Sequence, residues 1–243
     1  MTGRRVRLRH AFDGPDAKFA YTRYVFSTIA RRYDLITRVL SYGQDARWKR
    51  RVAEIVAGEG PPGGRVLDLA CGTGDIAWLL ADSHDVIGLD LTEAMLAIAK
   101  RRAPRPGARA GWVAGDMMRL PFAAAAFDVV TTSYGLRNVP VLEGALAEIA
   151  RVLRPGGLLV SLDFNNPDSR AVRAIYLGYL TLIGGALGLA LHGDSETYRY
   201  IPQSIRRYPG ARGVAALMRK SGFADVRIEP KLGGLMTIHA ARV

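Results

Sequence analysis

The sequence predicts a doubly wound α/β domain, in which helices cover both faces of a mostly parallel, seven-stranded sheet. From residue 64 onward, short apolar runs alternate with stretches of helical periodicity, which favours parallel strands joined by helices. The first apolar run ends in a glycine-rich turn, and the last two runs are joined by Gly233-Gly234 without a helix. The chain of 243 residues therefore predicts a single domain, residues 1–243, that ends in an antiparallel strand pair.

The first 57 residues predict a basic helical cap that precedes the sheet. Residues 1–18 are polar and are expected to be frayed. Residues 19–57 carry two or three helical patterns, whose apolar positions are Tyr24, Ile29, Tyr33, Trp48, Val52, Ile55 and Val56. A break at residues 58–64, which contains Pro61 and Pro62, separates this cap from the core.

The core, residues 58–170, holds five predicted strands, and the C-terminal part, residues 213–243, holds a helix and the other two strands. In order, the strands are expected at residues 66–69, 86–89, 110–114, 127–133, 158–163, 226–229 and 235–242. Helices are expected at residues 76–81, 93–102, 141–153 and 214–221. Thr92 is the expected N-cap of the second helix, Arg154-Pro155-Gly156-Gly157 stops the third, and Gly222 follows the fourth as its C′ residue.

An apolar insertion, residues 171–212, interrupts this alternation with a long helical stretch. Residues 175–191 are about the shortest length that could span a bilayer. The glycines and tyrosines in the stretch, and the α/β pattern that continues after it, favour a helix packed on the domain or lying on a surface.

Composition limits the compartment and the partners. Cys71 is the only cysteine, so no disulfide can form within the chain, which suits a reducing cytoplasm. The Arg-rich N-terminus is not followed by an apolar segment, so we expect no signal peptide. The four histidines are isolated, and no His, Cys and Asp cluster has the spacing of metal ligands, so no metal is expected.

The positive charge is concentrated at one end of the chain. The formal net charge is +12, and residues 1–51 hold 13 Lys and Arg against 4 Asp and Glu. Three interpretations compete: contact with an anionic membrane, contact with nucleic acid, and an ordinary solvated basic face. Nucleic acid is disfavoured because the charge is confined to the cap and no RNA-binding module is evident.

The turn Gly72-Thr73-Gly74 predicts a nucleotide-like ligand. Glycines at positions 72 and 74 let the backbone approach a ligand closely, and the Gly-x-Gly-x-x-Ala pattern permits a dinucleotide. Asp68, four residues before Gly72, favours S-adenosylmethionine (SAM) instead. Its carboxylate can hold the α-ammonium group of SAM, whereas it would repel a pyrophosphate. The alternative for Asp68 is a helix-capping carboxylate.

Residues after the next two strands extend this prediction. Asp90 ends the second strand and can accept both ribose hydroxyls, although dinucleotide enzymes use the same device. After the third strand, Asp116 can accept from the adenine amino group while Met117 packs on the ring. The alternatives are a loop aspartate for Asp116 and core packing for Met117.

Several longer motifs carry a resemblance to a known family. With Val66–Asp75, the pieces Leu120-Pro121-Phe122, Phe127-Asp128-Val129-Val130 and Arg151–Gly157 resemble class I SAM-dependent methyltransferases, which have a Rossmann-like fold. Arg32–Gly43 with Trp48-Lys49, Thr132–Val139 and Tyr198–Arg206 resemble the ubiquinone/menaquinone biosynthesis C-methyltransferases. The resemblance implies cofactor contacts at Thr73, Asp90, Leu91, Asp116, Met117 and Ser133. It also implies methyl transfer to a ring carbon of a polyprenylated quinol, which leaves S-adenosylhomocysteine.

Candidate catalytic residues follow from this reaction. Arg137 and Asn138 come after the fourth strand, at the edge where open α/β sheets bind ligands. We expect Arg137 to stabilise the phenolate that makes the ring carbon nucleophilic, and Asn138 to hold an oxygen. An arginine cannot act as the base, so Tyr33 and Asp163 are the next candidates. The alternatives are a structural salt bridge for Arg137 and core packing for Tyr33.

Three other functions stay open. The chain could be a C- or O-methyltransferase of a specialised aromatic, polyketide-like or other lipophilic small molecule, a nucleic-acid methyltransferase, or a protein that binds SAM without catalysis. A polyprenylated quinol would place a cytoplasmic enzyme at the inner face of the plasma membrane. The insertion, on the substrate side, would shelter the tail, and the basic N-terminus would touch headgroups. A homodimer is left open.

Overall fold

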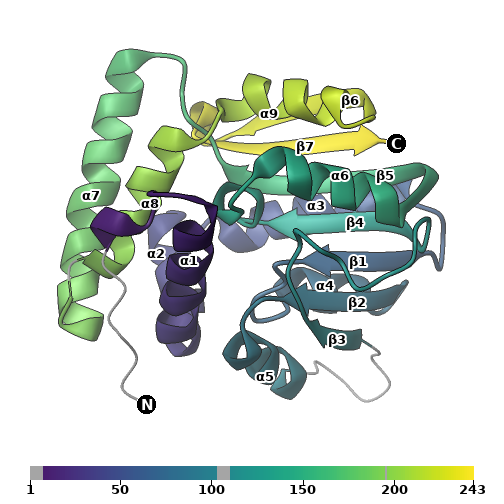
Figure 1. Cartoon of the computed structure of the whole chain (residues 1–243), viewed down its shortest axis with the longest axis horizontal. Coiled ribbons are helices and arrows are strands. Elements are labelled where there is room, and N and C mark those ends of the chain that lie inside the picture. Colours follow the sequence, from purple (N-terminus) through teal and green to yellow (C-terminus); the bar gives the residue numbers. More distant parts are fainter. Residues whose placement is uncertain (1–7, 103–109, 195) are drawn as a thin grey trace.

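The computed structural model describes residues 8–102, 110–194 and 196–243, and it is built around a seven-stranded sheet of order β3-β2-β1-β4-β5-β7-β6 (Figure 1). The first five strands pair in parallel, and β7 runs antiparallel between β5 and β6. The strands are β1 (Arg65–Leu69), β2 (Asp85–Asp90), β3 (Ala110–Ala114), β4 (Phe127–Ser133), β5 (Leu153–Phe164), β6 (Ala224–Lys231) and β7 (Met236–Arg242). The predicted fold class and the antiparallel C-terminal pair are confirmed.

Alternate side chains of the central strands enter two separate cores, because successive residues of a strand point to opposite faces of the sheet. In β1, Val66 packs with the core under α3 (Asp45–Glu59) and α4 (Asp75–Leu80). Its neighbour Leu67 packs with the core under α6 (Leu142–Val152) and α9 (Gly210–Lys220). The helix α5 (Glu93–Arg101) packs beside β2 and β3. Burial on both faces explains why the strands read as continuous apolar runs.

A layer of helices lies beyond one end of the sheet, near the carboxyl ends of the parallel strands (Figure 1). It consists of α1 (Pro15–Ile29), α2 (Tyr33–Leu40), α7 (Arg170–His192) and α8 (Glu196–Arg207). The sequence predicted the cap, the α7 helix and its position on the domain, but no helix over residues 196–207.

The N-terminal prediction needs a correction where the structure describes it. A 3₁₀ turn spans Leu8–His10, and α1 starts at Pro15 rather than after a frayed segment of 18 residues. Proline suits the first turn of a helix, where its missing N–H is not needed. Leu8 and Ala11 are buried in the cap, so these residues are part of its core. Residues 1–7 lie outside the described residues.

Two boundaries also differ from the prediction. The strand β5 begins at Leu153, because Leu153 pairs with Phe127 before the Arg154–Gly157 turn, and pairing resumes at Leu158 opposite Val129. Thr92 occupies the N-cap position of α5, but its side chain makes no capping hydrogen bond. Gly222 follows α9 with a φ of 94°, as expected for a C′ glycine.

Candidate active site

The glycine-rich turn joins β1 to α4 and has left-handed backbone at two of its glycines. Gly72 has a φ of 55° and Gly74 a φ of 86°. A Cβ on Gly74 would also lie 2.7 Å from the Trp112 ring, so packing excludes a side chain there. Ala70, in the same turn, and Tyr134, after β4, adopt positive φ values of 50° and 59° despite their side chains. Strained residues of this kind cluster at functional sites.

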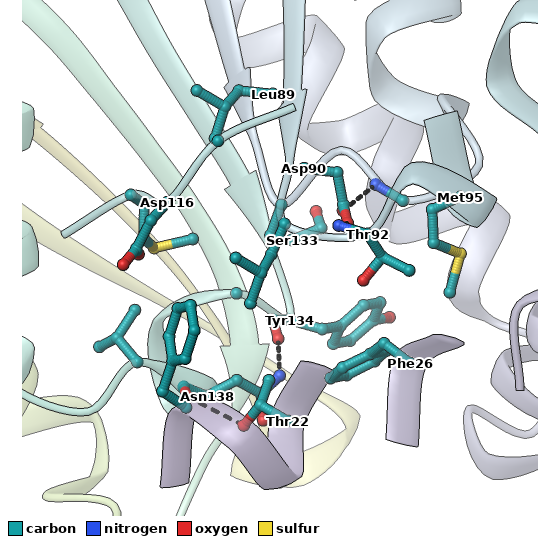
Figure 2. Close-up of a pocket in the computed structure, with 18 of the residues that line it drawn as sticks. Thr22, Phe26, Leu89, Asp90, Thr92, Met95, Asp116, Ser133, Tyr134 and Asn138 are labelled. Atoms are coloured by element: carbon teal, nitrogen blue, oxygen red, sulfur yellow. Dashed lines mark hydrogen bonds between the residues drawn. The ribbon is translucent and has the colours of Figure 1, made fainter. Parts of the chain in front are cut away.

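We call the cavity above this turn the main cavity. It is lined by predicted cofactor residues that come from three strand ends and from the glycine turn: Gly72, Asp90, Leu91, Asp116, Met117 and Ser133 (Figure 2). Asn138 and Tyr134 complete the wall. The structure therefore brings six of the nine predicted cofactor residues together around one cavity.

Asp90 holds the turn and still has capacity for a ligand. One carboxylate oxygen accepts from the backbone N–H of Gly72 and the other from that of Thr92, each at 2.8 Å. Each oxygen can accept a further hydrogen bond. Burial raises the pKa of the Asp90 carboxyl, and the two backbone donors oppose that rise. Two hydroxyls of a ribose would match the free acceptor positions.

Other polar atoms of the cavity wall lack partners among the described residues. The buried Ser133 hydroxyl and the buried Asn138 Oδ1 accept or donate no hydrogen bond there. Asp116 engages one oxygen with the Met118 N–H at 2.9 Å. Because buried polar groups are nearly always hydrogen-bonded, these atoms fit a polar ligand such as SAM.

The remaining three cofactor predictions lie beside this cavity. Asp68 and Thr73 line a smaller pocket that shares Tyr33, Gly72 and Ser133 with the main cavity, whereas Gly74 packs against Trp112. Asp68 accepts from the Thr131 hydroxyl at 2.8 Å and from the Ala77 N–H at 3.2 Å, so it does cap α4. Burial raises its pKa to about 7. Whether it also holds an ammonium group stays a prediction.

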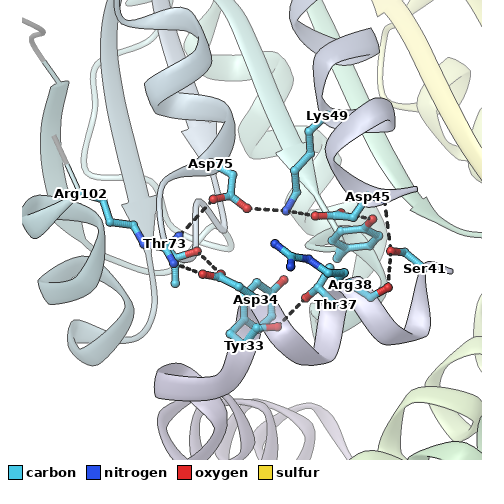
Figure 3. Close-up of polar contacts among 11 residues, drawn as sticks. Tyr33, Asp34, Thr37, Arg38, Ser41, Asp45, Lys49, Thr73, Asp75 and Arg102 are labelled. Atoms are coloured by element: carbon cyan, nitrogen blue, oxygen red, sulfur yellow. Dashed lines mark hydrogen bonds and ion pairs between the residues drawn. The ribbon is translucent and has the colours of Figure 1, made fainter. Parts of the chain in front are cut away.

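A polar network closes the smaller pocket and was not predicted (Figure 3). Lys49 Nζ lies 2.7 Å from a carboxylate oxygen of Asp45 and 2.7 Å from one of Asp75. Burial alone would lower the pKa of Lys49, but the two carboxylates outweigh burial and raise it. Asp45 also accepts from the Tyr134 hydroxyl at 2.6 Å. Lys49, Asp75 and Tyr134 occur in the sequence motifs described above, but those motifs offered no reason to assign them this role.

The network continues to α2 and α5. Arg102 pairs with Asp34 and, at 3.2 Å, with Asp75, while Asp34 accepts from the Thr73 hydroxyl at 2.9 Å. The Thr73 hydroxyl is therefore already engaged by the cap. Charged side chains from α2, α3 and α5 thus fasten the helical cap to the glycine turn.

A second cavity lies inside the helical layer and is mostly apolar. Its walls come from α1, α2 and α8, with Ile36, Tyr198 and Ile201 among the lining residues. Phe26, Tyr33 and Tyr134 line both this cavity and the main one. An apolar, partly aromatic space thus adjoins the main cavity, and the two share three aromatic side chains.

Arg137 lines the apolar cavity and pairs with Asp163, so two predicted catalytic residues meet. The Arg137 Nε lies 3.3 Å from Asp163 Oδ1, and both side chains are buried. Burial raises the pKa of Asp163, and the guanidinium opposes that rise. Arg137 also donates to Ser204, and its guanidinium lies 5.0 Å from the centre of the Phe164 ring. The structural salt bridge considered as an alternative is therefore present.

The other two catalytic predictions lie on the cavity walls. Asn138 faces the main cavity and donates from Nδ2 to the Tyr134 carbonyl at 2.7 Å, so it does not share the Arg137 cavity. Tyr33 lines all three spaces. Burial raises the pKa of Tyr33 to about 12, which makes its phenolate a scarce base near neutral pH. Within the described residues, no group of three or more His, Cys, Asp or Glu side chains could hold a metal ion.

Comparisons with known proteins identify the family. The model of the ubiE/COQ5 methyltransferase family matches residues 15–242. A demethylmenaquinone methyltransferase of Thermus thermophilus is 41% identical over 218 residues, covering 88% of this chain and 98% of the relative. One of Beutenbergia cavernae is 42% identical over 219 residues, covering 90% and 89%. A ubiquinone/menaquinone biosynthesis C-methyltransferase of Methylobacterium nodulans is 38% identical over 231 residues, covering 93% and 91%.

Solved structures support the fold. A SAM-dependent methyltransferase from Thermotoga maritima superposes with a TM-score of 0.65 at 20% identity and covers 91% of this chain and 99% of its own. At that identity the likeness concerns the fold alone.

Proposed function

Because the chain belongs to the ubiE/COQ5 methyltransferase family, we propose that it transfers a methyl group from SAM to a ring carbon of a polyprenylated quinol. The acceptor would be a demethylmenaquinol or a ubiquinol precursor, as the names of its relatives suggest. The observation that carries the proposal is the pair of adjoining cavities that share Phe26, Tyr33 and Tyr134. The main cavity carries the carboxylates of Asp90 and Asp116, and the second cavity is bordered by Arg137. A polar donor and an apolar ring can meet at that wall.

The main cavity has the donors and acceptors that SAM requires. Asp90 would accept the ribose hydroxyls, Asp116 the adenine amino group, and Met117 would pack on the adenine ring. The smaller pocket, with Asp68 and Gly72, would hold the methionine end. When bound, SAM supplies a strongly electrophilic methyl group and leaves as S-adenosylhomocysteine.

Arg137 would prepare the acceptor. A phenol ring becomes nucleophilic at the carbon beside its oxygen once water accepts the hydroxyl proton, and the methylated carbon then releases its own proton to water. The guanidinium has five N–H donors, and its contacts with Asp163 and Ser204 engage only two side-chain donors. The others can stabilise a phenolate in the apolar cavity, where charge–charge interactions are stronger than in water. We assign Asp163 the role of positioning Arg137, because its oxygens also accept from two backbone N–H groups.

The three shared aromatic residues would align donor and acceptor. Holding both reactants in one orientation removes much of the entropic barrier of a bimolecular step. Tyr134 is suited to this task because its hydroxyl is fixed by Asp45 and its ring lies 5.5 Å from that of Phe164. Tyr33, in this proposal, forms part of the wall rather than acting as the base.

A polyprenyl tail would keep the acceptor in the membrane. We therefore propose a cytoplasmic protein in peripheral contact with the inner face of the plasma membrane, aided by the basic cap. Arg31 and Arg38 are exposed on the cap and can face anionic headgroups.

An acceptor panel tests the reaction. The purified protein is incubated with methyl-labelled SAM and, separately, a demethylmenaquinol, a ubiquinol-precursor ring and small water-soluble phenols. The proposal expects label in a quinol and little in the small phenols. Preferential labelling of a small phenol would favour a specialised-metabolite methyltransferase, and labelling of no acceptor would contradict catalysis altogether.

A further inference from the structure

The long helix α7 stands at the outer edge of the helical layer, beside α8 (Figure 1). Its inner side packs tightly on the protein. Tyr176, Leu177 and Leu180 are buried, and a Cβ on Gly184 would lie 3.2 Å from the Tyr198 carbonyl oxygen of α8. Tyr179 stacks on Tyr42, just after α2, with ring centres 5.2 Å apart. These contacts fix one side of α7 against α2 and α8.

The outer side of α7 is apolar along its length. Ile175, Leu182 and Leu189 are 75%, 73% and 63% exposed. With Ala171, Gly178 and Ala186 they recur every three or four residues, which places them on one face of the helix. That face extends about 27 Å at 1.5 Å per residue, and residues 174–191 contain no Asp, Glu, Lys or Arg.

Exposed apolar side chains of the described residues are concentrated here. Of the eleven large hydrophobic residues that are substantially exposed, seven belong to α2, the turn after it, or α7. We call these seven residues the α2–α7 face: Leu35, Val39, Tyr42, Val172, Ile175, Leu182 and Leu189. A concentration of exposed apolar side chains on neighbouring helices is typical of an interaction site.

The charges around this face indicate what covers it. Arg31 lies just before α2 and Arg38 lies on it, and both are exposed. Arg170 lies at the start of α7, and the Arg32 guanidinium donates to the Leu191 carbonyl near the end of α7. Two acidic residues near them are engaged, because Asp34 pairs with Arg102 and Asp194 accepts from the start of α8. The acidic residues Asp168 and Glu196 are exposed at the two ends of the α7 segment. An apolar stripe with a basic rim is the pattern of a helix that lies in an anionic membrane surface.

We propose that the α2–α7 face docks on an anionic lipid bilayer, with α7 lying in the plane of the membrane. The helix is long and apolar enough to cross a bilayer, but one third of its apolar window is buried within the protein, which fits an in-plane position better. The same helices, α2 and α8, that pack on α7 also line the apolar cavity. Docking would therefore bring that cavity beside the acyl chains. This inference deepens the peripheral contact proposed above, but it does not depend on which ring is methylated.

Vesicle flotation tests the proposal. Wild-type protein is mixed with vesicles of phosphatidylglycerol and phosphatidylcholine, and with vesicles of phosphatidylcholine alone. We expect binding to the anionic vesicles that falls, without vanishing, at high salt. Leu182→Asp should weaken it about tenfold or more, because an exposed leucine that docking would place in the bilayer is replaced by a charge. Leu79→Asp, an exposed leucine on α4 away from the face, is the matched control and should bind like wild type.

Three outcomes would overturn the proposal. These are absence of wild-type binding to anionic vesicles, equal binding by Leu182→Asp and wild type, and a dimer that Leu182→Asp turns into a monomer, since a second copy would then cover the face. A thermal melt of Leu182→Asp checks that the variant is folded. Methyl transfer to a short-chain, water-soluble quinol should be the same in Leu182→Asp and wild type, so a wrong acceptor and a wrong docking face give different results.

Discussion

Arg137 and Asp163 were each predicted as catalytic candidates, but the sequence could not show that they form a pair. They are separated by 26 residues and meet because β4 and β5 are neighbours in the sheet. The pairing changes the expected effect of mutation. Removing the guanidinium would leave a buried carboxylate without its counter-charge, which costs stability as well as activity.

Arg137→Ala should lower the free energy of unfolding by about 3–5 kcal/mol and abolish turnover. SAM affinity should stay near the wild-type value, because Arg137 lines the second, apolar cavity and not the main cavity, where SAM would bind. Denaturant unfolding, calorimetry and rate measurements check the three parts. The double variant with Asp163→Asn should recover much of the stability but no turnover. Turnover at the wild-type rate in either variant would contradict the phenolate role.

Asp68 offers a test through pH. Burial raises its pKa to about 7 in the free protein, so near pH 7 about half of the carboxyl groups are protonated. A bound ammonium group would favour the charged carboxylate and lower that pKa, so binding should release protons between about pH 6 and 7 and none well above pH 8.

Calorimetry of SAM binding in buffers of different ionisation enthalpy measures that release. Asp68→Asn should abolish it while leaving binding detectable. Equal proton release by the variant and wild type would mean that Asp68 serves only to cap α4.

Among the elements, the network around Lys49 fastens α3 to the start of α4. Lys49→Met should destabilise the fold by about 3–5 kcal/mol, because it leaves Asp45 and Asp75 without the cation between them. Arg51→Met on the same helix is the control. The Arg51 side chain is 44% exposed, against 7% for Lys49, so solvent screens its pairs with Glu54 and Glu229, and the change should cost at most about 1 kcal/mol. Urea unfolding compares them, and equal losses would refute the structural importance of the network.

The glycines of α7 give a matched pair of substitutions. Gly184→Leu should destabilise by about 1–3 kcal/mol, because its side chain would press on Tyr198 of α8. Gly178→Leu has open space around it and should stabilise by about 0.5–1 kcal/mol through helix propensity. Thermal unfolding without lipid measures both. A loss at Gly178 as large as that at Gly184 would contradict the packing of α7 on α8.

Local sequence patterns predicted the helices and strands whose formation is determined by nearby residues. The strands before Gly72 and Asp90 and the helix after Thr92 follow from periodicity and turn residues. The helix α8 was missed because Pro202 lies inside it and the segment follows the end of α7. Its residues were recognised only as a motif. The early start of α1 was missed because Leu8 and Ala11 are buried by tertiary contacts that polar neighbours conceal.

In the functional site, too, some features could be predicted from local patterns and others could not. Strand ends meet at one edge of a parallel sheet, so Asp90, Asp116 and Ser133 could be placed together from sequence. The Lys49 and Arg102 network could not be predicted from sequence. Its residues come from α2, α3, α4 and the position after α5, and they share no local pattern. The separation of Asn138 from Arg137 into two cavities also depends on side-chain direction, which adjacent positions in the sequence do not reveal.

Taken together, the sheet presents the main cavity at its edge, the helical layer adds a second, apolar cavity, and the two cavities share three aromatic residues. This arrangement fits methylation of an aromatic ring. The ring would lie beside Arg137 and meet the donor where the two cavities adjoin. The α2–α7 face, on the same helical layer, fits an acceptor that is delivered from a membrane.

Carbon-13 NMR of the product tests this arrangement most directly. The protein is incubated with SAM labelled with ¹³C at the methyl group and with a demethylmenaquinol, and the quinol is extracted. We expect the label as a methyl group on a ring carbon, together with loss of the proton signal of that same ring carbon. Label in a methoxy group, or a quinol without label while a small phenol is methylated, would contradict it.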